Sequence, residues 1–160
     1  MKSGVSSLFL TLYLVLFLTA CSHVKTDYYP NGTVRSEITI QGGHYNGPAV
    51  FYYEDGIPMV ECDYVNDSLE GLMTRYHENG VKKEILYYKR NKPDSIFKKW
   101  NAQGQLLVES WYHEGLFNGN YKDYYDNGQI KSSGQYLDGQ PVGFWLFYDQ
   151  NGYLFKTENY

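Results

Sequence analysis

Apolar and polar residues alternate along most of the chain, and turn-forming residues interrupt the alternation at regular intervals. Such alternation is typical of β-strands, because successive side chains point to opposite faces of a sheet. The interruptions follow a period of 24 residues without an insertion, which predicts tandem copies of one small structural unit. Each copy has one turn glycine (Gly32, Gly56, Gly80, Gly104, Gly128 and Gly152) and, four residues earlier, one leading aromatic (Tyr28, Tyr52, Tyr76, Trp100, Tyr124 and Tyr148).

Each turn glycine ends a triplet such as Pro30-Asn31-Gly32 or Glu54-Asp55-Gly56. These residues suit a three-residue hairpin loop, whose last position is left-handed and therefore favours glycine. Such a loop places each leading aromatic opposite the residue two positions after the glycine. The predicted pairs are Tyr28 with Val34, Tyr52 with Pro58, Tyr76 with Lys82, Trp100 with Leu106, Tyr124 with Ile130 and Tyr148 with Leu154.

A second turn region follows about ten residues after each of the first five turn glycines, at 42–43, 66–67, 90–93, 114–115 and 138–139. A second glycine series comes next, at Gly47, Gly71, Gly119 and Gly143, with Ser95 in the third unit. Each unit therefore has two turns and two short strands. The pattern predicts an all-β domain of tandem β-hairpins over residues 28–160.

The apolar positions do not fall on one simple face. Alternation places Val34, Ser36, Ile38 and Ile40 together, and does the same for Leu106, Val108, Ser110 and Tyr112. The returning strands carry the series Ala49, Met73, Phe97, Tyr121 and Trp145, whose parity is opposite to that of the leading aromatics. Two explanations remain open: a bulge in each hairpin, or a sheet with both faces partly apolar.

The first residues have the features of a lipoprotein signal peptide. Lys2 precedes an apolar run of eleven residues at 8–18, which is too short to span a bilayer. The run ends in Leu18-Thr19-Ala20-Cys21, a lipobox. We expect a signal-peptide helix at 1–20, lipid attachment at Cys21 and a short tether at 21–27. The alternative is a buried apolar segment with an incidental cysteine.

These features predict a lipid-anchored protein of the bacterial cell envelope. Ser22, rather than aspartate, after the cysteine favours the outer membrane. The chain has 14 basic and 18 acidic residues, which argues against nucleic acid or an anionic surface as the main partner. With Cys21 acylated, Cys62 has no partner for a disulfide and is expected to be a small core residue.

The repeats resemble the variant MORN-repeat family of YwqK-like antitoxin components. The resemblance rests on segments such as 124–131 (YYDNGQIK), 134–139 (GQYLDG) and 143–148 (GFWLFY), and it covers residues 28–160. It implies an elongated, twisted antiparallel sheet of hairpins that serves as an interaction surface. The third unit departs from the pattern through Ser95 and the basic stretch at 89–92, so we expect an irregular hairpin there.

The sequence shows no catalytic or metal-binding motif. His23, His44, His77 and His113 fall at different phases of the repeat, which argues against a column of ligands. Glu37, Glu61 and Glu109 recur five residues after a turn glycine; a solvated strand face is favoured over an acid/base or Ca²⁺ row. We expect neither enzymatic activity nor a metal or other cofactor.

The aromatic residues have two interpretations, a structural ladder or a platform for a ligand. The leading aromatics recur in every unit, which favours the ladder, with rings stacked from hairpin to hairpin. Partner contacts are expected where units differ. The expected partner surface comprises Tyr53, Arg75, His77, Lys99 and Tyr125, with Asp123 beside it.

Three functions follow, in decreasing order of support. The first is a non-enzymatic, membrane-anchored scaffold that binds another protein or a glycan. The second is an antitoxin or immunity protein that neutralises a toxin met in the envelope. The third is an envelope hydrolase that uses scattered carboxylates such as Glu109.

Overall fold

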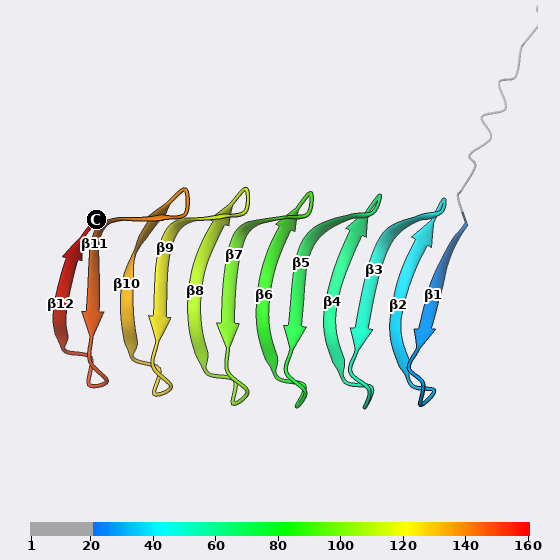
Figure 1. Cartoon of the computed structure of the whole chain (residues 1–160), viewed down its shortest axis with the longest axis horizontal. Helices are drawn as coiled ribbons and strands as arrows, with labels where there is room; N and C mark the ends of the chain where they lie inside the picture. Colours follow the sequence, from blue (N-terminus) through cyan, green and yellow to red (C-terminus); the bar gives the residue numbers. More distant parts are fainter. Residues whose placement is uncertain (1–20) are drawn as a thin grey trace, which may run out of the picture.

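A computed structural model describes residues 21–160 of the chain (Figure 1). The predicted signal-peptide helix lies outside the described residues. Residues 21–160 form twelve strands, and no helix among them is long and apolar enough to cross a bilayer. The strands are β1 (Ser22–Tyr28), β2 (Val34–Gln41), β3 (His44–Tyr52), β4 (Pro58–Val65), β5 (Ser68–Tyr76), β6 (Lys82–Lys89), β7 (Lys92–Trp100), β8 (Leu106–His113), β9 (Leu116–Tyr124), β10 (Ile130–Leu137), β11 (Gln140–Tyr148) and β12 (Leu154–Asn159).

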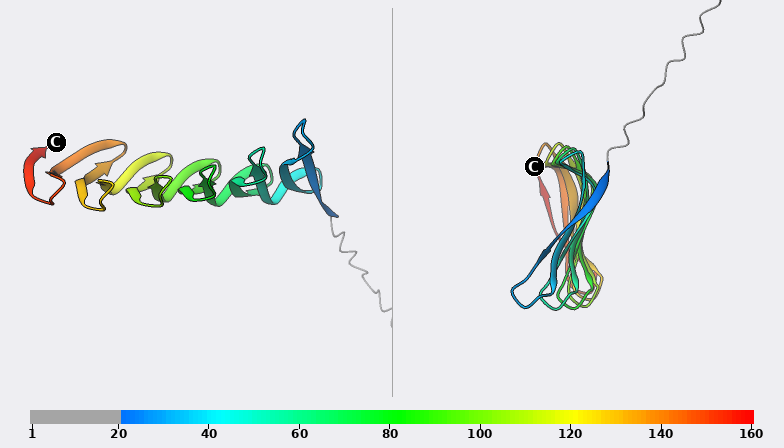
Figure 2. Two further views of the ribbon diagram at one scale, coloured as in Figure 1. Left: turned by 90° about the horizontal axis from the view of Figure 1, so that it is seen from below. Right: turned by 90° about the vertical axis from the view of Figure 1, so that its right-hand side faces the viewer.

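The strands form one sheet in chain order, each antiparallel to its neighbours. Figure 1 shows a long sheet with the three-residue loops at one end of the strands and the shorter turns at the other end. The end-on view in Figure 2 shows that the sheet twists along its length. The predicted all-β, elongated and twisted antiparallel sheet is therefore confirmed.

The strands begin earlier than predicted. Residues 21–27 were expected to be a tether, but Ser22–Tyr28 forms β1 and pairs with β2, from Ser22 opposite Gln41 to Tyr28 opposite Val34. The tether prediction is wrong because the first strand lacks an apolar residue that marks the other strands of its kind. Lys25 stands where the equivalent strands carry Ala49, Met73 or another apolar residue.

The three-residue loops have the predicted geometry. In the first loop the N–H of Gly32 donates to the carbonyl of Tyr29 at 2.9 Å, and the N–H of Tyr29 donates to the carbonyl of Thr33 at 2.8 Å. Gly32 is left-handed, with φ of 88°. All six predicted cross-strand pairs of the leading aromatics are present.

A bulge follows each of these loops, whereas Ala49 to Tyr52 alternate without interruption, so the leading aromatics lie on the face opposite Ala49 and both faces of the sheet are partly apolar. Phe51 lies opposite Val60 and Tyr52 opposite Pro58, so Met59 is an extra residue without a direct partner. The bulge reverses the alternation. Val34 therefore does not share the face of Ile38, contrary to the sequence analysis, and the same correction applies to Leu106.

The shorter turns have two residues, both with positive φ, as in Asn66 (48°) and Asp67 (65°). This is the type I′ hairpin turn that fits the twist of the strands. A second irregularity follows each turn: Ile38 lies opposite Ala49 but Ile40 opposite Tyr45, so three residues face one. The second glycine series lies in this irregularity. Ser95, which takes the place of glycine in the third hairpin, has the same left-handed conformation, with φ of 70°. The third hairpin keeps the common register, and the expected irregularity is wrong.

One row of side chains crosses the sheet and forms its centre. This core row comprises Ile38, Ala49, Cys62, Met73, Leu86, Phe97, Ser110, Tyr121, Gly134 and Trp145. We call its side of the sheet the core face and the opposite side the outer face. Cys62 is buried there as predicted, and burial raises the pKa of its thiol.

Large and small side chains alternate along the second half of the core row. Phe97 faces Ser110, Ser110 faces Tyr121, and Tyr121 faces Gly134. A Cβ at Gly134 would come within 2.3 Å of the Trp145 ring, so the indole covers the bare backbone of this glycine. A single layer can bury large rings in this way because each ring folds over a small neighbour.

Candidate interaction surface

The hairpin tips link consecutive units through the residue just after each leading aromatic. The hydroxyls of Tyr29, Tyr53 and Tyr125 donate to the carbonyl of the leading aromatic one unit later, at 2.6, 2.8 and 2.9 Å. In the same place Nε2 of His77 lies 3.0 Å from the carbonyl of Trp100. Tyr53, His77 and Tyr125 were predicted to contact a partner. Their polar atoms bond to the next unit and hold the repeats together, a role that the sequence analysis missed.

The leading aromatics do not form the predicted ladder of stacked rings. The ring pairs on the core face have centroids 4.3 to 6.3 Å apart and join mainly Phe97, Tyr112, Phe117, Tyr121, Tyr136, Trp145 and Tyr160. None of the ring pairs found in residues 21–160 includes a leading aromatic. The ladder prediction was wrong because each leading aromatic lies three residues after a core-row residue, as Tyr52 follows Ala49, and so points to the outer face.

On the outer face two leading aromatics donate to carboxylates of the adjacent strand. The hydroxyl of Tyr52 donates to Glu37 at 2.8 Å, and that of Tyr76 donates to Glu61 at 2.7 Å. Burial and the bond to Glu61 raise the pKa of Tyr76 to about 12. Glu109 instead accepts from Nζ of Lys98 at 2.7 Å. These carboxylates therefore have structural partners in addition to solvent.

The charged part of the expected partner surface lies on the core face, beside the core row. Arg75 and Lys99 both stand directly opposite Glu84, with Nε of Arg75 at 3.9 Å from its carboxylate. Asp123 lies 3.5 Å from Nζ of Lys131. Arg75 and Asp123, like the tip residues Tyr53, His77 and Tyr125, therefore already have polar partners within the sheet.

A different apolar surface lies on the outer face, in the middle of the sheet. It is made by one residue from each of β5 to β8: Leu72, Tyr87, Ile96 and Trp111, which we call the outer patch. Leu72 pairs directly with Tyr87, and Ile96 with Trp111. Leu72 is 46% exposed, and Tyr87 and Trp111 are each 37% exposed. Since the core row occupies the opposite face, the core does not account for these apolar side chains.

The outer patch is confined to the middle units. The same row continues through Pro48 and Asp63 toward the N-terminus, and through Asn120 and Gln135 toward the C-terminus. Seven residues after the turn glycine, the units carry Thr39, Asp63, Tyr87, Trp111, Gln135 and Asn159. This variation is the signal that could have identified the outer patch from the sequence. Differences were sought instead around the tips and the neighbouring charged positions.

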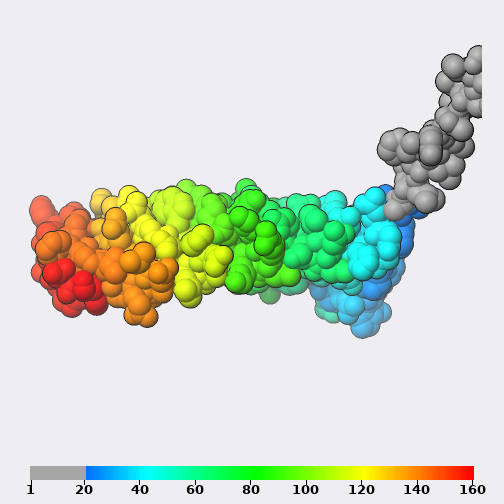
Figure 3. All heavy atoms as spheres, turned by 90° about the horizontal axis from the view of Figure 1, so that it is seen from above, coloured from blue at the N-terminus to red at the C-terminus, as the bar shows by residue number. Residues whose placement is uncertain are grey.

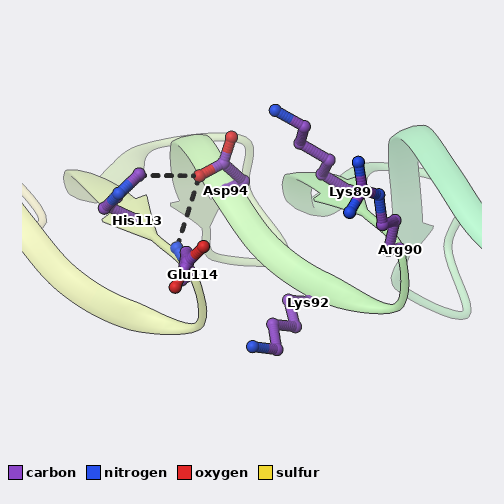
Figure 4. Close-up of a pocket in the computed structure, with 6 residues that line it drawn as sticks. All are labelled: Lys89, Arg90, Lys92, Asp94, His113 and Glu114. Carbon is purple, nitrogen blue, oxygen red and sulfur yellow. Dashed lines mark hydrogen bonds and ion pairs between the residues drawn. The ribbon is translucent and has the colours of Figure 1, made fainter.

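A shallow hollow of about 260 Å³ adjoins the outer patch at the two-residue turns. It is lined by Lys89, Arg90, Lys92, Asp94, His113 and Glu114. Asp94 accepts the backbone N–H of Glu114 at 3.3 Å and lies 3.2 Å from Nδ1 of His113. Figure 4 shows Asp94 between these two residues, with the three basic side chains apart from this group. Lys89 and His113 follow Tyr87 and Trp111 by two residues, so they share the outer face.

The predicted lipid-attachment residue and one of the histidines considered above lie apart from the outer patch. Cys21 is exposed and directly precedes β1. His44 contacts Asp67 at 2.6 Å at another hairpin end. Among residues 21–160, no group of three or more histidine, cysteine, aspartate or glutamate side chains is arranged to hold a metal ion.

Comparison with known families gives one match. The sequence model of the family described as MORN repeat variant matches residues 24–41, 45–66, 69–90 and 117–138, which together make up just over half of the chain. No curated protein matches the chain significantly. Residues 91–116 fall between two matched segments and form the same hairpins, in the same register, as the matched units.

Proposed function

The chain belongs to the MORN repeat variant family, and on that premise we propose that it is a non-enzymatic, lipid-anchored scaffold of the bacterial envelope. The family's repeats suggest a binding or scaffold role in general. In this proposal the sheet presents the outer patch to a protein partner, and a lipid on Cys21 holds the protein at the membrane.

The outer patch is the observation that supports binding to a protein. Tyrosine and tryptophan are enriched at the centres of protein interfaces, because they bury a large area and lose little side-chain entropy. In the outer patch, Tyr87 pairs with Leu72 and Trp111 pairs with Ile96, so each aromatic residue has an aliphatic neighbour. The charged hollow at 89–94 and 113–114 supplies a polar rim on one side. This arrangement fits a partner with an apolar centre and charged flanks.

Substitution of an aromatic residue in the outer patch tests the proposal. The full protein, extracted from crosslinked cells, is used to identify the partner, whose affinity is then measured for wild type and for Trp111→Ala. A central aromatic anchor contributes about 2 kcal/mol or more, so the affinity should fall about 30-fold. Phe144→Ala is the matched control, because Phe144 is exposed on the outer face but lies on β11, away from the patch. Equal binding by wild type and Trp111→Ala would show that the outer patch is not the interface.

The anchor is tested separately. Cells are labelled with a fatty-acid analogue, and wild type is compared with Cys21→Ala and Cys62→Ala. We expect label on wild type and Cys62→Ala and none on Cys21→Ala, since Cys62 is buried in the core row. An unlabelled wild-type protein would remove the lipid from the proposal, and with it the outer-membrane location. The patch would remain testable.

The family resemblance makes a toxin one specific partner to test, in which case the protein is an antitoxin. An exported lipoprotein does not meet a toxin that acts in the cytoplasm, so the toxin would have to be encountered in the envelope. Co-expression should then rescue cells from that toxin, and Trp111→Ala should lose the rescue. If a soluble glycan competes for binding instead, the aromatic residues of the outer patch bind sugar rings and the partner is a glycan.

A further inference from the structure

The sheet has two outer edges, at β1 and β12. Among residues 21–160, β1 pairs with β2 alone and β12 with β11 alone, so each of these two strands has one side without a partner strand. Figures 1 and 3 show that these edges lie at opposite ends of the elongated molecule, so they do not meet within one copy. β12 runs antiparallel to β1 because the twelve strands alternate in direction. The two edges are therefore oriented for antiparallel pairing between copies.

The two edge strands also belong to complementary halves of the repeat. β1 precedes a turn glycine and is equivalent to β3, the second strand of a unit. β12 follows a turn glycine and is equivalent to β2, the first strand of a unit. When β12 of one copy lies beside β1 of another, the two strands make one complete unit at the spacing found throughout the sheet.

The register of the array then determines which residues meet. Within the sheet Ser36 lies opposite Phe51, Glu37 opposite Val50 and Ile38 opposite Ala49. The 24-residue period gives the equivalent residues of β12 and β1, and with them three pairs between two copies. Lys156 meets Asp27 of a second copy, Thr157 meets Thr26, and Glu158 meets Lys25.

Both charged pairs join opposite signs. In the single copy each edge satisfies its own charges, with Lys25 at 3.4 Å from Asp27 and Lys156 at 2.6 Å from Glu158. These four side chains occupy rows that continue through the sheet, and Lys25 and Glu158 stand at the two ends of the core row. The row beside it already contains a cross-strand charge pair of this kind, Arg75 opposite Glu84.

We propose that this protein associates head to tail, with β12 of one copy pairing with β1 of the next to continue the sheet. The partner is a second copy of the same chain. Charged residues on edge strands usually prevent such pairing. Here each edge carries one charge of each sign, in the order that complements the other edge. The junction also covers the apolar side chains that the edges leave exposed, among them Val24 and Tyr160.

Two symmetric contacts compete with the head-to-tail contact. Two copies of β12 paired around Thr157 would place Lys156 opposite Glu158, and two copies of β1 paired around Thr26 would place Lys25 opposite Asp27. Both symmetric contacts are also favourable in charge. Reversing the charges of one edge separates the three arrangements. The double substitution Lys25→Glu/Asp27→Lys leaves both symmetric contacts complementary but places like charges opposite each other in the head-to-tail contact.

The test is sedimentation equilibrium of the protein produced from its full sequence, in a density-matched non-ionic detergent at low salt. We expect the wild-type mass to rise with protein concentration beyond a dimer, because a head-to-tail dimer still has one free β1 edge and one free β12 edge. Lys25→Glu/Asp27→Lys should lose this association. Adding Lys156→Glu/Glu158→Lys should restore it. A wild type that stays monomeric, a first variant that still associates, or a fourfold variant that does not recover would each overturn the proposal.

Disulfide trapping on cells gives a second measurement. Thr26→Cys and Thr157→Cys are placed on two differently tagged copies and expressed together. Head-to-tail pairing gives a disulfide-linked product that contains both tags. Thr74→Cys with Thr157→Cys is the matched control, because Thr74 lies in the same row in the middle of the sheet. Products with two Thr157→Cys copies, in place of the mixed product, would support the symmetric contact and contradict the proposal.

Discussion

The close contact between Gly134 and Trp145 gives a stability prediction that depends on the core row alone. Gly134 has a backbone conformation without positive φ, unlike most glycines of this sheet. Its substitution by alanine therefore tests space and not backbone strain. The new Cβ would lie 2.3 to 2.6 Å from three atoms of the Trp145 ring.

The indole would have to move by about 1 Å to reach ordinary contact with the new Cβ. Trp145 is only 6% exposed, and its ring has Tyr121, Tyr136 and Tyr160 around it at 5.1 to 6.2 Å between centroids. Overpacking at such a site costs about 1–3 kcal/mol. Replacing glycine by alanine regains about 0.5–1 kcal/mol, because alanine loses less conformational entropy on folding than glycine does. We expect Gly134→Ala to lower the free energy of unfolding by about 1–2 kcal/mol.

The second half of the prediction uses Trp145→Ala as a background. This substitution alone should cost about 3–5 kcal/mol, because it removes a large buried ring. With the indole gone, the clash at residue 134 is gone as well, so Gly134→Ala should be neutral or slightly stabilising. The coupling energy between the two sites should be at least 1 kcal/mol.

Urea unfolding followed by far-ultraviolet circular dichroism measures all four proteins of this cycle. Ser133→Ala is the control, since residue 133 is the chain neighbour of Gly134 but points to the other face. It should change the free energy of unfolding by less than about 0.5 kcal/mol. If Gly134→Ala destabilised the wild type and the Trp145→Ala background equally, the alternation of large and small residues would not explain the core row.

Three further predictions concern the repeat itself. Ser95→Gly should raise the free energy of unfolding by about 0.5–1 kcal/mol in urea titrations, because glycine adopts the left-handed conformation without strain; Gly71→Ser should do the reverse. Tyr125→Phe removes a bond of 2.9 Å between units and should cost about 0.5–1.5 kcal/mol by the same assay. Burial raises the pKa of Tyr76 and Tyr121 from 10.0 to about 12. These hydroxyls lose their protons at a lower pH in the unfolded chain than in the folded one. The free energy of unfolding should therefore fall as the pH rises from 10 to 12, and less steeply in Tyr121→Phe.

The repeat was predictable because its turns carry their own chemistry. A glycine at the end of a triplet such as Asp126-Asn127-Gly128 specifies the loop, and the loop specifies the pair of Tyr124 with Ile130. These are local effects, so one sequence is enough to see them. Ser95 lies elsewhere, in the irregularity after the two-residue turn, where the neighbouring pairs hold it in the left-handed conformation that glycine adopts in other units.

The faces of the sheet were less predictable, because a bulge has no residue signature in this sequence. Its extra residue, Met59 in one unit, resembles any other strand residue. The recurrence of the leading aromatics led to Tyr52 being predicted as a stacking residue and Tyr53 as a partner residue. The structure shows Tyr52 bound to a carboxylate and Tyr53 bonded to the next unit. The outer patch was missed because Trp111 could not be placed on the face opposite the core.

The edges account for the remaining error and connect the two proposals. Lys25 concealed the first strand because it replaces an apolar core-row residue, and the same charge is what the head-to-tail pairing uses. A lipid on Cys21 would hold β1 of every copy at the membrane, since Cys21 directly precedes that strand. In a single anchored copy the later units could extend away from the membrane. In a head-to-tail series β12 would have to meet the β1 of a neighbour, which the neighbour's lipid would keep at the same surface. Both ends of each sheet would then lie at the membrane, and the outer patches would repeat along it, one in each copy.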